Sequence, residues 1–192
     1  MREDVIRWEQ RYQKRRELPP VKPDIALKQH LHLFPDCGVV LDVACGLGDS
    51  CAPLLGKGLT VIGIDASQTA LRLARHRLQP FATNGGSSFL PLVLDLDTLA
   101  LPTDHFAAIV ILRYLNLDLV RRLKQSVQTH GVFFFLTFNK YHLADQPGFN
   151  PAFLLKDGDL QQAFSDWRIL EFEENTHGSS YILAKRPPID IV

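Results

Sequence analysis

From Gly38 onward, the sequence alternates short apolar runs with segments of helical periodicity. The apolar runs are VVLDV (39–43), TVIGI (60–64), FLPLVL (89–94), AAIVIL (107–112) and VFFFLTF (132–138). Such alternation is typical of βαβ units, in which each strand is buried in a parallel sheet and the connections cross over its faces. Five parallel strands are therefore predicted.

Two of the connections show a helical pattern. Ser67 is a suitable N-cap, and the apolar side chains after it recur at helical spacing, as Ala70, Leu71, Ala74 and Leu78. A second helix is predicted to end near Gly131, with an inner face of Val120, Leu123 and Val127. Helices on the faces of the sheet would complete a three-layer sandwich.

The last two apolar runs are WRILEF (167–172) and SYILA (180–184). The segment between them, EENTHGS, is too short for a parallel crossover, so the two runs should form an antiparallel hairpin at one edge of the sheet. The predicted fold class is α/β: a Rossmann-like three-layer sandwich with a seven-stranded, mostly parallel sheet and a C-terminal antiparallel hairpin. A chain of 192 residues suits one core of this size, so residues 1–192 are predicted to be a single domain.

Residues 1–23 are predicted to form a helical arm and a linker that precede the sheet. Over residues 4–17 a helix would carry one apolar stripe, made by Val5, Trp8 and Tyr12. The segment LPPVKP (18–23) cannot be helical because its three prolines lack N–H donors. After this linker, a further helix is predicted over residues 24–34.

Charge and cysteine content narrow the range of functions. Basic and acidic residues balance at 21 each, so no field of one sign attracts nucleic acid or an anionic membrane. No apolar run approaches the roughly 18–20 residues of a membrane span, and the charged N-terminus lacks a signal-peptide core. Three cysteines without a CxxC pair favour a reducing cytoplasm over a disulfide framework or a zinc site. No metal site is predicted, and both a monomer and a homodimer are compatible with the sequence.

The loop after the first strand, LDVACGLGDS (41–50), contains Gly46 and Gly48. Glycines there permit a tight turn and close approach of a ligand to the backbone, and a helix that opens near Asp49 presents unpaired N–H groups. In open α/β sheets, ligands bind outside the carboxyl ends of the strands, beside the first strand. Asp65 ends the second strand, where a carboxylate suits the two hydroxyls of a ribose.

A second acidic side chain, Asp95, ends the third strand. With the neighbouring backbone, its carboxylate could bind the amino group and ring nitrogen of an adenine. Either acid alone would more often be a strand-end cap, and a glycine pair alone could be a plain turn. Together they indicate a ligand that contains adenosine.

Asp42, at the end of the first strand, discriminates between such ligands. A dinucleotide would place its diphosphate beside this carboxylate, which is repulsive, and Cys51 occupies the position of the third glycine. S-adenosylmethionine instead brings an ammonium and a sulfonium, which a carboxylate attracts. No GxxxxGK[ST] motif of a P-loop occurs.

The segment VVLDVACGLGDSCAPLLGKGLTVIGIDAS resembles the first motif and second strand of class I S-adenosylmethionine-dependent methyltransferases, and the resemblance continues through LVLDLDTLALP to the terminal hairpin. WEQRY in the arm, RYLN (113–116) and FNPAFLLKDGDL (149–160) resemble small bacterial methyltransferases of the tellurite-resistance and thiopurine types. The resemblance implies a cofactor-binding set of Asp42, Ala44, Cys45, Gly46 and Gly48 at the methionine, Asp65 and Ala66 at the ribose, Asp95 and Leu96 at the adenine, and Trp8 and Tyr12 in an arm over the cofactor.

Candidate catalytic residues follow the fourth and fifth strands. Methyl transfer needs mainly in-line alignment, with a base where the acceptor is not yet nucleophilic. Arg113 could orient an anionic acceptor or form a structural salt bridge, Tyr114 lies beside it, and His142 could be a base or a solvated surface residue. Residues 139–150 are long enough for a lid, and LTFN (136–139) differs from the Glu-Thr-Phe-Thr of many close relatives.

The predicted function is methyl transfer from S-adenosylmethionine to a small-molecule acceptor. A non-catalytic sensor of the cofactor or an interaction protein is the main alternative, since such a protein would keep the cofactor loops. A nicotinamide-dependent oxidoreductase would share Asp65 but should favour a third glycine and avoid Asp42.

Overall fold

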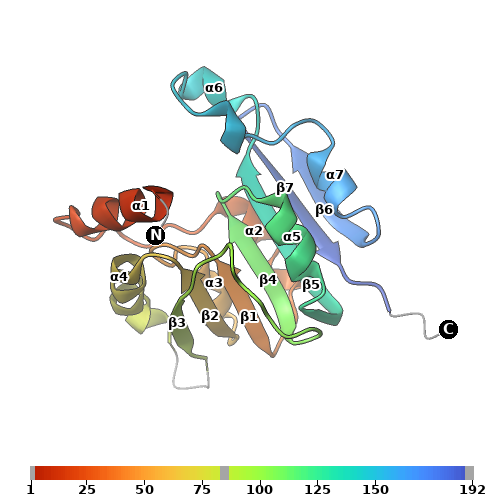
Figure 1. Cartoon of the computed structure of the whole chain (residues 1–192). Coiled ribbons are helices and arrows are strands. Elements are labelled where there is room, and N and C mark those ends of the chain that lie inside the picture. The colour runs from red at the N-terminus through yellow and green to blue at the C-terminus, as the bar shows by residue number, and fades with distance from the viewer. Residues whose placement is uncertain (1–2, 83–86, 189–192) are drawn as a thin grey trace. The chain divides into compact units, whose positions relative to one another are not determined.

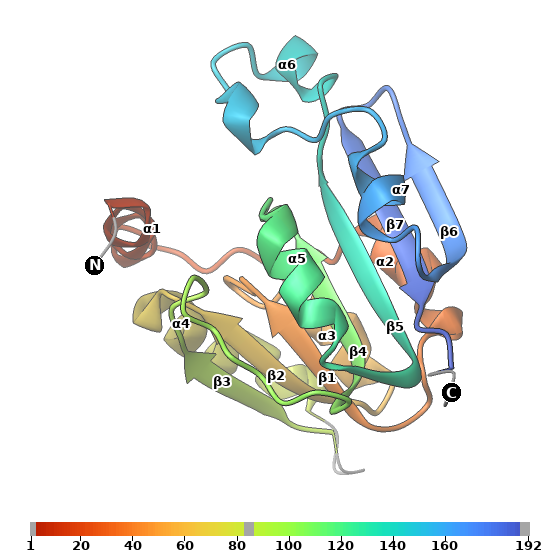
Figure 2. The same ribbon diagram turned by 45° about the vertical axis from the view of Figure 1, so that its right-hand side comes forward.

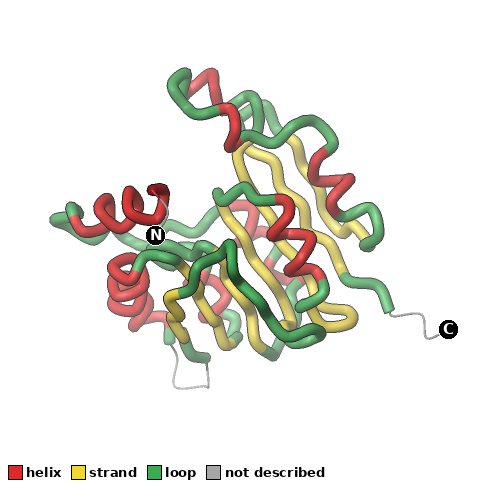
Figure 3. The backbone as a smooth tube through the Cα atoms, in the orientation of Figure 1, coloured by secondary structure: helices red, strands yellow, loops and turns green. Residues whose placement is uncertain are grey.

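The computed structural model describes residues 3–82 and 87–188. Its contacts divide the chain into two compact units, Met1–Ala100 and Leu101–Val192. Figure 1 labels the helices and strands of both, and Figure 3 shows that each unit contains strands with helices beside them.

The first unit contains three parallel strands in the order β3-β2-β1. Its elements are α1 (Glu3–Gln13), α2 (Ile25–Gln29), the 3-10 helix η1 (Leu31–Leu33), β1 (Val39–Val43), α3 (Cys51–Gly56), β2 (Thr60–Asp65), α4 (Gln68–Leu78), η2 (Gln79–Phe81) and β3 (Phe89–Val93). Helix α4 packs on β2 and β3, and α1 packs on α4. The carboxyl ends of β1 and β2 coincide because Val43 pairs with Ile64.

Helix α4 has the cap and the buried face that its sequence predicted. The Ser67 hydroxyl accepts a hydrogen bond from the Ala70 amide at 3.0 Å. The predicted inner residues are all buried: Ala70, Leu71, Ala74 and Leu78. Apolar burial at this spacing stabilises a helix whose propensity alone would not suffice.

The second unit contains four strands in the order β4-β5-β7-β6. Its elements are β4 (Phe106–Leu112), α5 (Leu117–Lys124), β5 (Val127–Phe138), α6 (His142–Asp145), η3 (Pro151–Phe153), α7 (Asp159–Ala163), β6 (Arg168–Glu174) and β7 (Ser179–Lys185). β4 and β5 are parallel, whereas β7 is antiparallel to both β5 and β6. The turn of the β6–β7 hairpin is visible in Figure 2.

The predicted fold class is confirmed, because seven strands form a mixed, mostly parallel sheet that ends in an antiparallel hairpin. Three consecutive phenylalanines, Phe133 to Phe135, are fully buried in β5. Within the described ranges, no helix combines the length and the apolar character that a membrane crossing requires.

The helix predicted to end near Gly131 is shorter than expected. Helix α5 ends at Lys124, and Val127 starts β5, where it is fully buried and pairs with Phe106. At Gly131 a β-carbon would lie 2.7 Å from the Ala107 carbonyl oxygen, so this glycine allows two strands to pass closely and does not end a helix.

The helix predicted over residues 24–34 is instead the five-residue α2 followed by η1. His30 leaves helical geometry at φ −100° and ψ 8°, and Pro35 disfavours a helical conformation at Phe34. The arm helix α1 also ends earlier than predicted, at Gln13.

Candidate functional site

The glycine loop after β1 has three residues in the left-handed region. They are Ala44 at φ 56°, Gly46 at 52° and Gly48 at 78°. A β-carbon at Gly48 would lie 2.7 Å from a methyl of Leu78, so the loop is tightly packed against α4. The loop is tied to β2 by the Cys45 amide, which donates to the Ile64 carbonyl at 3.1 Å. The loop is thus a largely buried turn whose backbone conformation suits glycine.

Asp42 is fully buried beside this loop. Its Oδ2 accepts hydrogen bonds from the Ser50 hydroxyl at 2.5 Å and from the Cys51 thiol at 3.0 Å. Its Oδ1 has no hydrogen-bond partner within residues 3–82 and 87–188. Burial raises the pKa of Asp42 to about 6. A buried, unsatisfied carboxylate oxygen is costly unless a ligand satisfies it, and a cationic group suits it.

Asp65 ends β2 and fastens the glycine loop. Its Oδ2 accepts from the Gly46 amide at 2.9 Å, and its Oδ1 accepts from the Ser67 amide at 2.8 Å. Burial raises the pKa of Asp65. Each carboxylate oxygen has a second lone pair, so the group can still accept hydrogen bonds from a diol. Ala66 follows it and is partly exposed.

The arm helix α1 lies over this loop through residues of one face. Glu9 accepts hydrogen bonds from the hydroxyls of Ser67 and Thr69, each at 2.5 Å, and so binds the start of α4. The Tyr12 hydroxyl covers Gly46, where a β-carbon would lie 2.8 Å from it. Burial, with a smaller contribution from the charge of Asp65, raises the pKa of Tyr12 to about 12.

Of the two predicted arm aromatics, only Tyr12 covers the loop. Trp8 is 44 % exposed, stacks on Tyr12 at 5.9 Å between ring centroids and lies under the Arg11 guanidinium. Sequence reasoning missed Glu9. The available signal was its place between Trp8 and Tyr12, because a helix turns all three toward neighbouring positions.

The predicted adenine-side residues lie beyond the third strand. β3 ends at Val93, so Asp95 does not end the strand as predicted. Asp95 is exposed, and its Oδ1 accepts from the Asp97 amide at 3.0 Å, whereas Leu96 is buried. Asp95 therefore shapes its own turn, and its contact with adenine remains a prediction.

The predicted catalytic residues all belong to the second unit. Arg113 follows β4 in a left-handed conformation, φ 58°, with its amide donating to the Leu136 carbonyl at 2.7 Å. A non-glycine residue held there is strained, which is common at functional sites. Arg113 is exposed and Tyr114 is partly buried.

His142 lies in an aromatic cluster after β5. Its ring stacks on Phe138 at 4.0 Å and meets the edge of Phe149 at 4.8 Å. The imidazole is therefore held in one orientation and is not a freely solvated surface group.

Asn139 begins the segment predicted as a lid. Its side chain is fully buried, and its Nδ2 donates to the carbonyls of Asn175 and Ser179 at 2.9 Å and to the Ser180 hydroxyl at 3.0 Å. The asparagine of LTFN thus anchors β5 to the β6–β7 turn. Helix α6 occupies part of residues 139–150.

The structure brings together Tyr12, Asp42, the glycine loop and Asp65 within the first unit. Arg113, Tyr114 and His142 lie in the second unit. Residues 3–82 and 87–188 contain no group of three side chains that could hold a metal ion.

Residues 40–131 match a family model described as a methyltransferase domain. No curated protein matches the sequence. The predicted resemblance to S-adenosylmethionine-dependent methyltransferases is confirmed by this match and by the fold.

Solved structures share this fold. A protein from a study of the conversion of a disulfide bond into a thioacetal group during echinomycin biosynthesis has a TM-score of 0.71 and 19 % identity, over 96 % of this chain and 93 % of that one. TehB from Haemophilus influenzae has a TM-score of 0.68 and 16 % identity, over 84 % of this chain and 61 % of that one.

A third structure is geranyl diphosphate C-methyltransferase from Streptomyces coelicolor A3(2), solved with Mg²⁺, geranyl diphosphate and S-adenosyl-L-homocysteine. Its TM-score is 0.65 at 15 % identity, over 84 % of this chain and 75 % of that one. At identities this low, the structural similarity establishes a common fold alone.

Proposed function

We propose that this protein binds S-adenosylmethionine and transfers its methyl group to a small-molecule acceptor. The observation that carries the proposal is Asp42, whose fully buried Oδ1 has no hydrogen-bond partner within the described residues. The ammonium of the cofactor's methionine moiety would satisfy this oxygen and its charge. The match to a methyltransferase domain supports the same conclusion.

The other proposed cofactor contacts also lie in the first unit. Backbone from Ala44 through Cys45 and Gly46 to Gly48 would line the methionine moiety. Asp65, with Ala66 beside it, would accept hydrogen bonds from the ribose hydroxyls. The adenine is assigned to Leu96 and Asp95, and the Tyr12 hydroxyl over Gly46, with Trp8 behind it, would close the site.

The bound cofactor supplies a methyl group on a sulfonium, which is already activated for in-line displacement. The task of the protein is then to align the acceptor and remove its proton. Arg113 is the candidate for orienting an anionic acceptor, with Tyr114 beside it. His142 is the candidate base, because Phe138 and Phe149 hold its ring in a fixed orientation.

The acceptor is proposed to be a small molecule because the chain has no excess of basic charge for a nucleic acid. We also propose that residues 1–192 act as a single domain with an arm and linker at residues 1–23. The three free thiols support a reducing, cytoplasmic setting.

Calorimetric titration with S-adenosylhomocysteine, with NADH titrated in parallel, tests the cofactor assignment. Micromolar binding of S-adenosylhomocysteine alone is expected. Binding of NADH alone would favour an oxidoreductase, and binding of neither would remove the basis of the proposal. Cofactor binding without turnover over a broad panel of acceptors would instead favour a sensor.

A further inference from the structure

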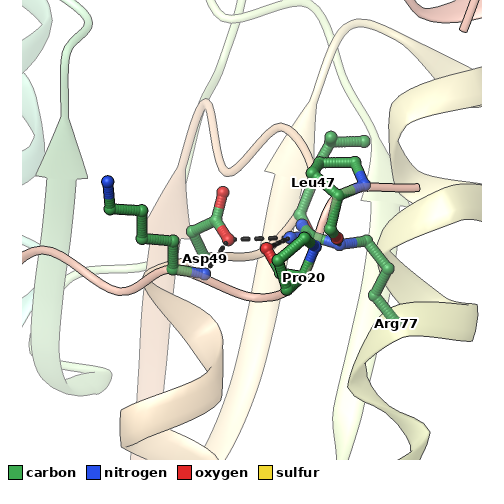
Figure 4. Close-up of polar contacts among 6 residues, drawn as sticks. Pro20, Leu47, Asp49 and Arg77 are labelled. Carbon is green, nitrogen blue, oxygen red and sulfur yellow. Dashed lines mark hydrogen bonds and ion pairs between the residues drawn. The ribbon is translucent and has the colours of Figure 1, made fainter. Parts of the chain in front are cut away.

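A buried arginine links the glycine loop to the arm. Arg77, in the last turn of α4, has a side chain that is only 3 % exposed. Its Nη1 donates to the Leu47 carbonyl at 2.5 Å, and its Nη2 forms an ion pair with Asp49 at 2.9 Å. Figure 4 shows the guanidinium between these two loop residues and Pro20.

The same guanidinium binds the linker. Nη2 donates to the Pro20 carbonyl at 2.9 Å, and Nε donates to the Pro19 carbonyl at 3.1 Å. Prolines have no N–H, so these two residues can be fastened by hydrogen bonds only through their carbonyls. Asp49 adds a further tie, because its Oδ1 also accepts from the Lys22 amide at 2.8 Å.

These contacts require an arginine. Three different guanidinium nitrogens act as donors to four acceptors, in a planar arrangement that a lysine ammonium cannot reproduce. Loss of this fork of guanidinium donors would leave the Leu47 carbonyl without its hydrogen bond, at a site where water has little access.

Helix α4 therefore holds the arm and linker at two places. Near its start, Ser67 and Thr69 bind Glu9. In its last turn, Arg77 binds the linker at Pro19 and Pro20. Between these attachments the Tyr12 hydroxyl covers Gly46.

We propose that Arg77 is a positioning residue for the cofactor: through one guanidinium it sets the conformation of the glycine loop and the seat of the arm that covers it. This inference rests on the proposed binding of S-adenosylmethionine. Arg77 itself touches the Leu47 carbonyl and the linker, and it acts on the cofactor through the loop and Tyr12.

The test is Arg77→Lys, which keeps the charge and loses the fork. S-adenosylhomocysteine is titrated by calorimetry, and limited trypsin digestion is followed after Lys14, Arg15 and Arg16. We expect the Kd to rise about tenfold, within the range of typical site-to-site couplings. We also expect trypsin to cleave these sites faster than in the wild type when no ligand is bound. S-adenosylhomocysteine should protect them less than it does in the wild type.

The matched control is Arg186→Lys in the second unit. Arg186 likewise donates to backbone carbonyls, those of Gln125 and Val127, and pairs with Asp104. Its replacement should lower the Tm while the Kd and the linker cleavage stay at wild-type values. An Arg77→Lys variant that loses Tm but keeps a wild-type Kd and cleavage rate would overturn the inference.

Asp49→Asn provides a second variant if Arg77→Lys does not fold. It removes the charge that pairs with Arg77 but keeps an oxygen that can accept from the Lys22 amide. A smaller rise in Kd, about threefold, with faster linker cleavage is expected, and wild-type behaviour in both assays would overturn the inference. Failure of the proposed function is distinguishable, because the wild type itself would then not bind S-adenosylhomocysteine.

Discussion

The cofactor region of the first unit and the aromatic region after β5 are built differently. In the first unit, polar groups from distant parts of the chain bind one another: Glu9 binds Ser67, and Asp65 binds Gly46. After β5, His142 is held by ring contacts with Phe138 and Phe149, and one buried amide anchors the segment. A polar network offers hydrogen-bonding groups that select a ligand by its chemistry. An aromatic cluster instead fixes the shape of a region and the orientation of its rings.

Replacing Asp42 is the strongest way to break the cofactor side of this comparison. Asp42→Asn removes the charge that would bind the cofactor ammonium, and we expect affinity for S-adenosylhomocysteine to fall by about 2–3 kcal/mol, the scale of hydrogen bonds to charged groups. Calorimetry measures the loss. Asp36→Asn, which removes an exposed partner of Lys57, is the control and should bind normally. Equal affinities in both variants would refute the role of Asp42.

Gly46→Ala should loosen the arm. A β-carbon there meets the Tyr12 hydroxyl at 2.8 Å, and the residue has φ 52°. The left-handed conformation alone costs a non-glycine residue about 1–2 kcal/mol. We expect a lower free energy of unfolding in urea and faster trypsin cleavage after Arg15. Gly56→Ala is the control, because nothing lies within 4 Å of a β-carbon at that position. Unchanged cleavage of Gly46→Ala would show that Tyr12 does not fasten the arm.

Cofactor affinity should depend on pH through Asp42. Because its folded-state pKa is raised to about 6, its contribution to stability is present below about 4 and is lost as the pH rises to about 6. The ammonium of the cofactor's methionine moiety requires the ionised form of Asp42. The affinity should therefore fall about tenfold for each unit of pH below 6. Calorimetric titrations with S-adenosylhomocysteine from pH 7.5 to 5 measure this change in affinity. If Asp42→Asn keeps the same pH dependence, another group is responsible for it.

His142→Phe sharpens the comparison with the smallest effect on stability. Phenylalanine preserves the ring contacts with Phe138 and Phe149, so we expect the free energy of unfolding to change by less than about 1 kcal/mol. Cofactor affinity should be unchanged, while kcat with an identified acceptor should fall if His142 is the base. His105→Phe, at the amino end of β4, is the control. If His142→Phe kept the wild-type kcat, His142 would not be the base and its ring would serve only in packing.

Local sequence patterns predicted correctly where several residues of the proposed cofactor site lie in the fold. The end of β1, the glycines at Gly46 and Gly48, and Asp65 at the end of β2 were all placed correctly. They follow from strand periodicity and backbone requirements, which act over a few residues. Val127 was misassigned because a valine after a helix fits either periodicity, and only its pairing with Phe106 decided for the strand.

The sequence by itself determined the strands, the glycine loop and the acidic residues that indicate the cofactor, because these depend on local burial patterns and conformational limits. Tertiary structure alone revealed Glu9 at the start of α4 and Arg77 between the linker and the loop. Glu9 and Ser67 lie 58 residues apart in the chain, as do Arg77 and Pro19. A hydrogen bond of that kind leaves no periodic signal, since it depends on where two packed segments meet and not on spacing within either one.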